Sequence, residues 1–296
     1  MASKTNHLEE SKGCALGLFE RPREEGLVAQ AKRLPLFPLV SVVMTSFNSG
    51  AWIRRSVGSI LQQKFVKLEL IVVDDGSTDD TVQVLESLSQ RDSRLRILSM
   101  PHNGGTYRAK NLGISHARGH AITFADSDDV SHPDRLRLQL RALRGRNLVA
   151  STCNYVRRTS DGTLVLNRGL SERQALISLM IKREVINEIG WFDDVRIAAD
   201  DEFFERIRHV YGRSAHVNVA KPLYTALLRD GSLSTSAATS SSLDTSAGDA
   251  YLSPVRVRYQ HAYRQWYAEL DARGKRPYVP GNRPATRPFP ADDLIR

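Results

Sequence analysis

Short apolar runs that end in polar turns recur along the first half of the chain and alternate with segments of helical periodicity. Each run is short enough for a strand and rich in β-branched residues, which predicts buried strands near residues 40–45, 69–74, 95–98, 120–125 and 148–154. The segments between them place apolar residues on one side, as amphipathic helices do. This alternation predicts an α/β fold with a right-handed, doubly wound, mostly parallel sheet.

The pattern after residue 154 is more mixed. Asp161-Gly162 indicates a hairpin turn between strands at 155–158 and 163–166. An apolar run covers 175–181, and a helix is expected from about Asp201. We therefore expect one catalytic unit over residues 39–230. Its nucleotide-binding half would be 39–154, and a smaller acceptor-side half would be 155–230.

The regions outside this unit have a different composition. Residues 1–38 are polar and lack periodicity, so they are expected to form an extension. Ten of the twenty residues in 231–250 are Ser or Thr, which predicts a flexible loop. Within 251–296, a helix from Pro254 to about Ala272 precedes a proline-rich, irregular tail. An apolar stripe on that helix either packs on the catalytic unit or faces a membrane or partner.

Composition is that of a globular protein of 296 residues, with 41% hydrophobic and 25% charged residues. No apolar stretch approaches the roughly 18 residues of a membrane-spanning helix. Acidic residues interrupt the first 38 positions and argue against a signal peptide. The two cysteines, Cys14 and Cys153, have neither disulfide nor metal-ligand spacing, so a cytoplasmic location is expected.

The formal net charge of +9 is uneven, because residues 251–296 hold nine Lys or Arg against four Asp or Glu. This basic segment could simply be solvated. Alternatively, it could bind an anionic acceptor or make peripheral contact with the inner face of a membrane. No nucleic-acid-binding motif is present, so nucleic acid is not an expected partner.

The most informative motif is an acidic cluster directly after an apolar strand. Residues 121–125 form the strand, and Asp126 and Asp128 follow at its carboxyl end, where open parallel sheets bind ligands. Two carboxylates at this spacing can converge on a divalent cation such as Mg²⁺ or Mn²⁺. The alternative is an acidic turn that caps the next helix.

A second pair of acids, Asp74 and Asp75, follows the strand at 69–74. An acceptor at this position suits the imide N–H or the ribose hydroxyls of a nucleotide. Turn formation around Gly76 is the competing interpretation.

Four motifs occur in order at regular spacing: V-S-V-V-M-T-S-F-N at 40–48, V-V-D-D-G-S-T-D at 72–79, N-G-G-T-Y-R-A-K-N at 103–111 and F-A-D-S-D-D at 124–129. Together they resemble the family 2 glycosyltransferases, which are inverting, nucleotide-sugar-dependent enzymes with a GT-A fold. The resemblance covers roughly residues 39–234. The continuation at 133–136 is most similar to bacterial enzymes of surface polysaccharide synthesis.

The resemblance implies roles for individual residues. Asp128 would be the direct metal ligand, and Asp126 would contact the ribose or a metal-bound water. Asp75 would accept from a uracil-type base of a UDP-sugar, and Thr45 would line the same pocket. Further donor contacts are expected from residues near the family's Arg-Asn pair, with a lysine in place of the usual arginine: Arg108, Lys110 and Asn111.

The acceptor, a glycan or a lipid-linked molecule, needs a general base. The segment 197–206 resembles the family's catalytic segment and places Asp200 as that base. The neighbouring acids Asp201 and Glu202 would raise its pKa. The alternative is that Asp200 or Asp201 is the N-cap of the next helix.

The chain departs from the family pattern in two places. By this resemblance, Ala199 stands where relatives have the glutamate that precedes the base, and Arg229 stands where many relatives have a metal-binding histidine. The alternatives are a sugar nucleotidyltransferase and a non-catalytic protein that binds nucleotide-sugars. A nucleotidyltransferase usually has a Gly-rich basic loop after the first strand. This chain has Thr-Ser-Phe-Asn-Ser-Gly at residues 45–50 instead, which argues against that alternative.

Overall fold

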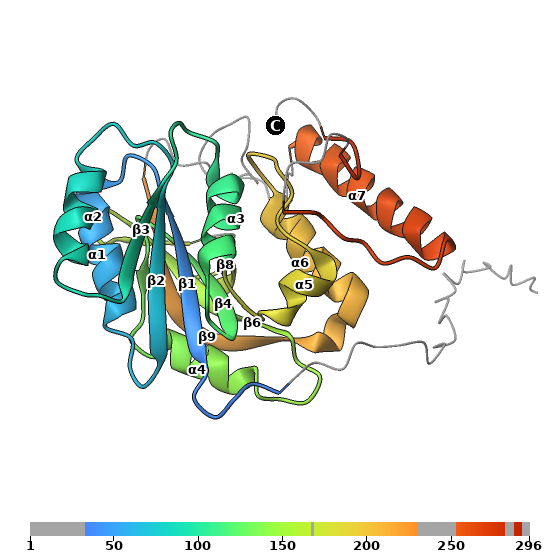
Figure 1. The fold of residues 1–296 in the computed structure, drawn as a ribbon, viewed down its shortest axis with the longest axis horizontal. Coiled ribbons are helices and arrows are strands. Elements are labelled where there is room, and N and C mark those ends of the chain that lie inside the picture. The colour runs from blue at the N-terminus through green and yellow to red at the C-terminus, as the bar shows by residue number, and fades with distance from the viewer. Residues whose placement is uncertain (1–32, 167–168, 230–252, 282–286, 292–296) are drawn as a thin grey trace, which may run out of the picture.

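A computed structural model describes residues 33–166, 169–229, 253–281 and 287–291 of the chain (Figure 1). The described elements, in chain order, are β1 (Leu39–Ser46), α1 (Gly50–Leu61), β2 (Lys67–Asp74), α2 (Thr81–Ser89), β3 (Leu95–Ser99), α3 (Thr106–His116), β4 (Ala121–Asp126), β5 (Val130–Ser131), α4 (Arg135–Ala142), β6 (Ala150–Thr159), β7 (Leu164–Val165), β8 (Arg173–Lys182), α5 (Glu184–Ile189), α6 (Ala199–Tyr211), the 3-10 turn η1 (Arg213–Ala215), β9 (His216–Leu228) and α7 (Pro254–Ala272).

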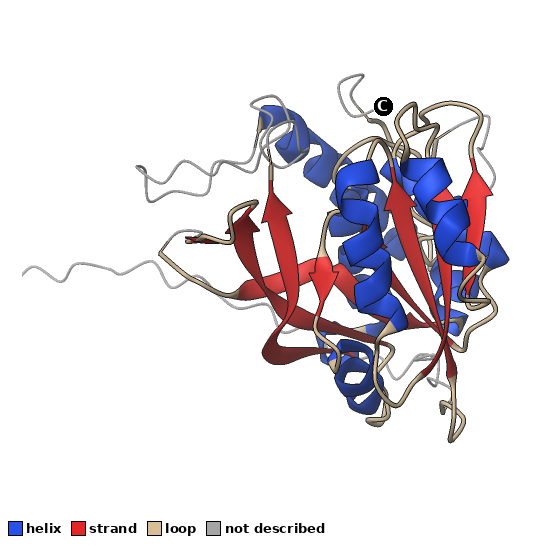
Figure 2. Cartoon of the chain, turned by 90° about the vertical axis from the view of Figure 1, so that its left-hand side faces the viewer, coloured by secondary structure: helices blue, strands red, loops and turns tan. Residues whose placement is uncertain are grey.

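The described strands form a single nine-stranded sheet in the order β3-β2-β1-β4-β8-β6-β9-β5, with β7 paired to β6. The first four of these run parallel, and β8 joins β4 antiparallel. β6 and β9 are again parallel. Figure 2 shows the strands beyond β4 leaving the plane of the parallel part. The predicted doubly wound, mostly parallel sheet is therefore confirmed, with a mixed region beyond it.

Two hydrophobic cores lie on opposite faces of the parallel strands. Val42 and Met44 of β1 belong to the core that includes α1, α2 and α4, whereas Val43 belongs to the core that includes α3, α5, α6 and α7. Successive side chains of a strand point to opposite faces, and the consecutive apolar residues Val42, Val43 and Met44 of β1 therefore contribute to both cores. Figure 1 shows α1 and α2 on one side of these strands and α3 on the other.

All five strands predicted in the first half are present. The last of them is longer than expected, because β6 continues to Thr159 and forms the predicted hairpin with β7. The predicted boundary between residues 154 and 155 thus falls within one strand.

The longest strand, β9, was not predicted. Pro222 lies in its middle, and proline normally disfavours the interior of a strand. The β6–β9 pairing shifts register at Asn154, which pairs with Pro222, so an irregularity accommodates the proline.

The C-terminal helix has the predicted bounds, Pro254–Ala272, and its apolar stripe is buried in the same core as α6. Val255, Tyr259 and Tyr263 are buried as expected, and Tyr267 joins them. Packing on the catalytic unit is therefore the observed role of this stripe. The described helices include none that is long and apolar enough to cross a membrane. The expected loop 231–250 and residues 1–32 of the expected extension lie outside the described residues.

The tail after α7 also packs against the catalytic unit. Val279 forms a bridge with Gly190, and the ring of Phe289 lies 5.0 Å from that of Trp266 and 5.6 Å from that of Tyr259. Phe289 is 3% exposed. The described part of the proline-rich tail is irregular, as predicted, but it completes the hydrophobic core.

Candidate active site

The carboxyl ends of β1, β2 and β4 place three predicted site residues along one edge of the sheet. Thr45 is paired in register with Asp126, and Ser46 is paired with Asp74, which precedes Asp75. Because the three strands are parallel, their polar ends converge at one edge. The sequence-predicted clusters therefore belong to one site.

Asp126 is the last residue of β4 and is half-buried. Its backbone N–H donates to the hydroxyl of Tyr224 at 3.1 Å. Burial raises the pKa of Asp126 to about 6, while the ammonium of Lys110 lowers it. Asp129, which accepts from the N–H of Leu227, also has a pKa raised by burial. Asp129 thus fastens the acidic turn to β9.

Asp128 faces a cation supplied by the chain itself. Its Oδ2 lies 2.6 Å from Nε of Arg229, the residue that directly follows β9. The guanidinium carbon of Arg229 lies 4.8 Å from the ring centroid of Trp52 in α1, a distance typical of a cation–π contact. The ion pair and the ring hold Arg229 at the acidic edge.

A divalent cation fits this site only with help from a ligand. The described residues include no group of three or more His, Cys, Asp or Glu that could hold a metal ion. Asp126 and Asp128 supply two carboxylates, and Mg²⁺ typically combines one or two carboxylates with substrate phosphates. The residues therefore fit a cation shared with a diphosphate, provided that Arg229 releases Asp128.

The two acids at the end of β2, Asp74 and Asp75, have different functions. Asp74 accepts from the backbone N–H of Ser77 at 3.0 Å and from its hydroxyl at 2.5 Å, so it shapes the turn. Asp75 accepts from the N–H groups of Gly104 at 2.7 Å and Gly105 at 2.8 Å. Burial raises the pKa of Asp75, and these two donors oppose that shift. Turn formation, the competing interpretation, explains Asp74.

Thr45 lies beside the helix that Asp75 anchors. Its hydroxyl is 3.0 Å from that of Thr106, the first residue of α3, and the residue is 8% exposed. Thr45 and Asp75 thus meet at the start of α3, and their predicted contacts with a nucleotide base stay predictions.

The three predicted donor contacts on α3 point to protein partners. Arg108 forms a bidentate ion pair with Asp194. Its Nε donates to Oδ1 of Asp194, and its Nη2 donates to Oδ2 at 3.1 Å. The amide of Asn111 bonds both the carbonyl of Phe192, at 2.9 Å, and its N–H, at 3.1 Å. These two residues fasten the segment between α5 and α6.

Lys110 is 5% exposed and lies among aromatic rings. Its Nζ is 5.2 Å from the ring centroid of Tyr107, 5.8 Å from that of Phe124 and 5.7 Å from that of Phe192. Its charge acts on Asp126. Its predicted reach to phosphate stays a prediction, and its described contacts are with these rings.

Asp200, the predicted base, is the second residue of α6. Its Oδ1 accepts a hydrogen bond of 2.6 Å from the hydroxyl of Tyr107. It also interacts electrostatically with Asp126, which places it in the same site as the acidic edge. The N-cap is Ala198, with φ of 67°, and no side chain caps the helix. The alternative that Asp200 or Asp201 is the N-cap is therefore wrong.

The two acids that follow Asp200 lie in different environments. Glu202 is fully buried, where it pairs with Arg206 at 2.8 Å and accepts from Tyr267 at 2.8 Å. Burial, and secondarily the charge of Asp200, raises the pKa of Asp201 to about 7. Asp201 lies 3.7 Å from Arg256 of α7.

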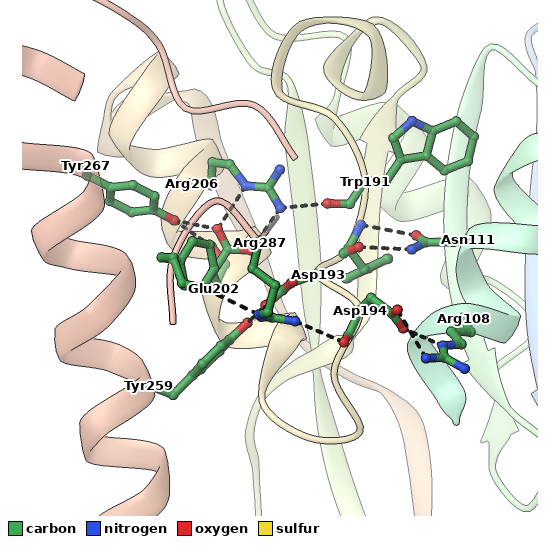
Figure 3. A network of polar contacts seen from close by, with 12 residues as sticks. Arg108, Asn111, Trp191, Asp193, Asp194, Glu202, Arg206, Tyr259, Tyr267 and Arg287 are labelled. Atoms are coloured by element: carbon green, nitrogen blue, oxygen red, sulfur yellow. Dashed lines mark hydrogen bonds and ion pairs between the residues drawn. The ribbon is translucent and has the colours of Figure 1, made fainter. Parts of the chain in front are cut away.

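Residues 190–198, which connect α5 to α6, are held from three sides (Figure 3). Asp194 is bound by Arg108 of α3, Asp193 accepts from Tyr259 of α7 at 2.7 Å, and Arg287 of the tail also binds Asp193. This clamp fixes the segment that leads into the first turn of α6, and hence Asp200.

Several residues of the site were not predicted from the sequence. Tyr107, Trp52 and Tyr224 contact Asp200, Arg229 and the backbone of Asp126, respectively. Tyr107 lies inside the 103–111 motif, so its position was a usable signal. No pattern in the sequence indicated Trp52 or Tyr224, because each reaches the site from a distant element.

A doubly wound sheet with carboxylates at this edge defines a protein of the GT-A type. The chain belongs to glycosyl transferase family 2, because the model of that family matches residues 41–202, more than half of the chain.

Curated relatives agree with this assignment. A putative teichuronic acid biosynthesis glycosyltransferase of Bacillus subtilis is 36% identical over 126 residues, which cover 43% of this chain and 50% of that protein. The chondroitin synthase of Pasteurella multocida is 33% identical over 194 residues, or 61% of this chain and 20% of that protein. The chain thus spans half or less of the length of these relatives.

Solved structures share the fold. S. aureus TarS (residues 1–349) in complex with UDP has a TM-score of 0.53 at 22% identity, covering 64% of this chain and 60% of that one. A mannosyltransferase of Pyrobaculum calidifontis, in complex with GDP-Man and Mn²⁺, has a TM-score of 0.52 at 19% identity, covering 71% and 63%. At these identities the likeness establishes the fold.

Proposed function

We propose that the protein is an inverting glycosyltransferase that moves a sugar from a nucleoside diphosphate sugar to a hydroxyl of an acceptor. The observation that carries the proposal is the position of Asp200. It lies within electrostatic reach of the acid at the end of β4, with one carboxylate oxygen held by Tyr107. A general base that faces a donor-binding edge is what a single displacement requires.

The donor would bind at the ends of β1, β2 and β4. Thr45 and Asp75 would border the base, and Asp126 would meet the ribose. A UDP-sugar is favoured because TarS structures contain UDP and UDP-GlcNAc, although a further neighbour contains GDP-Man. Arg108 and Asn111 would act indirectly, by holding the segment that leads to Asp200.

Asp128 and Asp126 would hold Mg²⁺ or Mn²⁺ together with the donor diphosphate. The chemistry that such a cation supplies when bound is neutralisation of the charge on the leaving group. Arg229 closes this position by pairing with Asp128. We infer that the pair opens when the donor binds, and that the guanidinium then turns to the diphosphate.

Asp200 would act through its second oxygen. Oδ1 accepts from Tyr107, which leaves Oδ2 to take the proton of the acceptor hydroxyl. The acceptor oxygen forms a bond to the anomeric carbon as the bond from that carbon to the diphosphate oxygen breaks. Attack opposite the leaving group inverts the configuration, and the nucleoside diphosphate leaves with the electron pair.

We propose surface polysaccharide synthesis as the setting, because relatives include a putative teichuronic acid biosynthesis enzyme and a chondroitin synthase. Within the chain, residues 39–154 would bind the donor and residues 155–230 the acceptor, with 231–250 as a linker to the C-terminal segment. Peripheral contact of residues 251–296 with an anionic membrane is supported by their positive charge.

Incubation with labelled UDP-sugars tests the proposal. Release of UDP, with transfer of the label to an acceptor or to water, is expected. Release of pyrophosphate would identify a nucleotidyltransferase instead. Binding of UDP-sugar without turnover, in the presence of Mn²⁺ and an acceptor extract, would identify a non-catalytic protein. Either of these outcomes would overturn the proposal.

A further inference from the structure

A groove runs between helices α6 and α7, outside the donor site. It consists of two hollows, of about 290 and 400 Å³. Both are lined by Glu205 of α6 and by Tyr263 and Arg264 of α7, so they are adjacent. At one end the groove reaches Asp201, and at the other it reaches Arg213.

The Asp201 end of this groove lies next to the catalytic centre. Asp201 follows Asp200 directly in the first turn of α6. The same end is lined by Gln174 and Leu176 of β8. β8 is antiparallel to β4, with Thr123 opposite Met180, so its earlier residues extend beyond the carboxyl end of β4, where Asp126 lies.

The lining suits hydroxyl groups. Two amide side chains, Gln174 and Gln260, can each donate and accept. The charged residues largely pair with one another, since Glu205 lies 2.6 Å from Arg208 and His209 lies 3.1 Å from Asp271. The groove therefore has no strong excess of one charge, which disfavours a phosphate-rich ligand.

Tyr263 supplies a second observation that points to a ligand. The residue is fully buried, and its hydroxyl has no hydrogen-bond partner among the described residues. Buried polar groups are rarely left unpaired. Because Tyr263 lines both hollows, a hydroxyl bound in the groove would lie near it, and a small displacement of the side chains that cover the Tyr263 hydroxyl would let the two groups bond.

The groove is long enough for more than one sugar unit. It follows α6 from Asp201 to beyond the end of the helix at Tyr211. A rise of 1.5 Å per residue makes the helical part of this path about 15 Å long.

From these observations we propose that the groove between α6 and α7 binds an oligosaccharide acceptor, uncharged or weakly charged, whose end reaches Asp200. This inference rests on the proposed function and deepens it. It assigns several sugar units to the protein surface, with Gln174 and Gln260 beside the first of them. A carrier with a single sugar would leave most of the groove empty.

The test uses the full-length protein with a UDP-sugar that the wild type consumes. The probes are maltose, cellulose and chitin oligosaccharides, each from disaccharide to hexasaccharide, and a polyprenyl diphosphate that carries one sugar. Gln260→Ala is compared with Gln265→Ala, which makes the same change on the solvent-exposed side of the same helix. Donor hydrolysis by water and thermal stabilisation by UDP are measured in parallel.

We expect the KM for at least one series to fall as the chain lengthens. Gln260→Ala should raise the KM for the longest chain about two- to tenfold, the usual effect of one hydrogen bond, whereas Gln265→Ala should not. Donor hydrolysis should stay unchanged in both variants.

The inference is wrong if no series shows a dependence on length, if the two glutamine variants behave alike, or if the single-sugar lipid is used as well as the hexasaccharides. These results would leave the proposed function standing as long as UDP is released. If no UDP-sugar is consumed under any condition, the proposed function itself fails.

Discussion

The hydroxyl of Tyr107 donates a hydrogen bond of 2.6 Å to Oδ1 of Asp200, and thereby joins the first turn of α3 to the first turn of α6. The ring of Tyr107 also lies against the ammonium of Lys110, whose charge acts on Asp126. The proposed base and the acid at the end of β4 are thus linked through Tyr107 and Lys110.

Replacing Tyr107 with phenylalanine should change the pH dependence of transfer. Hydrogen bonds to charged groups contribute about 1.5–3 kcal/mol, so loss of this donor should move the acidic limb of the kcat profile upward by about one pH unit or more. The KM for the donor should be unchanged. Tyr278→Phe, at an exposed tyrosine, is the control. An unmoved profile would show that Tyr107 has only a structural function.

Asp200→Asn should retain donor affinity but lose transfer by about two to four orders of magnitude, the usual effect of removing a general base. Asp201→Asn is the matched variant, because its carboxylate lies near Arg256 rather than Tyr107. It should keep most of kcat. Single-turnover transfer and UDP binding measure the two effects. If Asp201→Asn is inactive and Asp200→Asn is active, Asp201 and not Asp200 is the general base.

Asp128 and Arg229 should have opposite effects on the response to metal. UDP with Mn²⁺ or Mg²⁺ should raise the Tm of the wild type, and Asp128→Ala should abolish the metal-dependent part of that rise. Arg229→Ala frees Asp128 from its 2.6 Å ion pair, so the metal-dependent part should increase while stabilisation by UDP without metal decreases. Equal metal-dependent shifts in wild type and Asp128→Ala would contradict this assignment.

The strands and acids of the donor side could be predicted because their signals are local. A short apolar run followed by Asp126 and Asp128 indicates a strand end, and the run that ends in Asp74 and Asp75 repeats that pattern. The proposed base was found only through resemblance, and its partner Tyr107 comes from an element 93 residues away. The periodicity of the sequence indicates neither the contact between Tyr107 and Asp200 nor the burial of Lys110. Strand β9 could not be predicted because Pro222 lies within it. The register shift that accommodates this proline occurs in the pairing with β6, a different part of the sequence.

Stability should depend on pH through Asp201. Burial raises its pKa in the folded protein to about 7, above the usual 3.8. Between these values the unfolded chain loses the proton first, so the contribution of Asp201 to stability is full below about pH 4 and falls as the pH rises to 7. The Tm of Asp201→Asn relative to wild type should therefore rise from pH 4 to pH 7 in thermal unfolding. A constant difference would show that Asp201 ionises normally.

The C-terminal tail should stabilise the segment that precedes the base. Arg287 binds Asp193, whose side chain is 3% exposed, and it donates to the carbonyl of Asp194 at 3.2 Å. Arg287→Ala would leave a buried carboxylate without its cation. Breaking a buried pair costs about 3–5 kcal/mol, and the lower end applies because Arg287 is 20% exposed.

Urea unfolding at neutral pH measures this loss, and Asp193→Asn in the same chain should restore part of it, since a neutral amide needs no counter-charge. Arg276→Ala is the matched control. Its ion pair with Glu188 spans 3.9 Å between side chains that are 46% and 34% exposed, and partly exposed pairs at such a distance contribute about 0–1 kcal/mol. If Arg287→Ala costs no more than Arg276→Ala, the tail does not hold residues 190–198. Transfer activity would then be expected to survive removal of the tail.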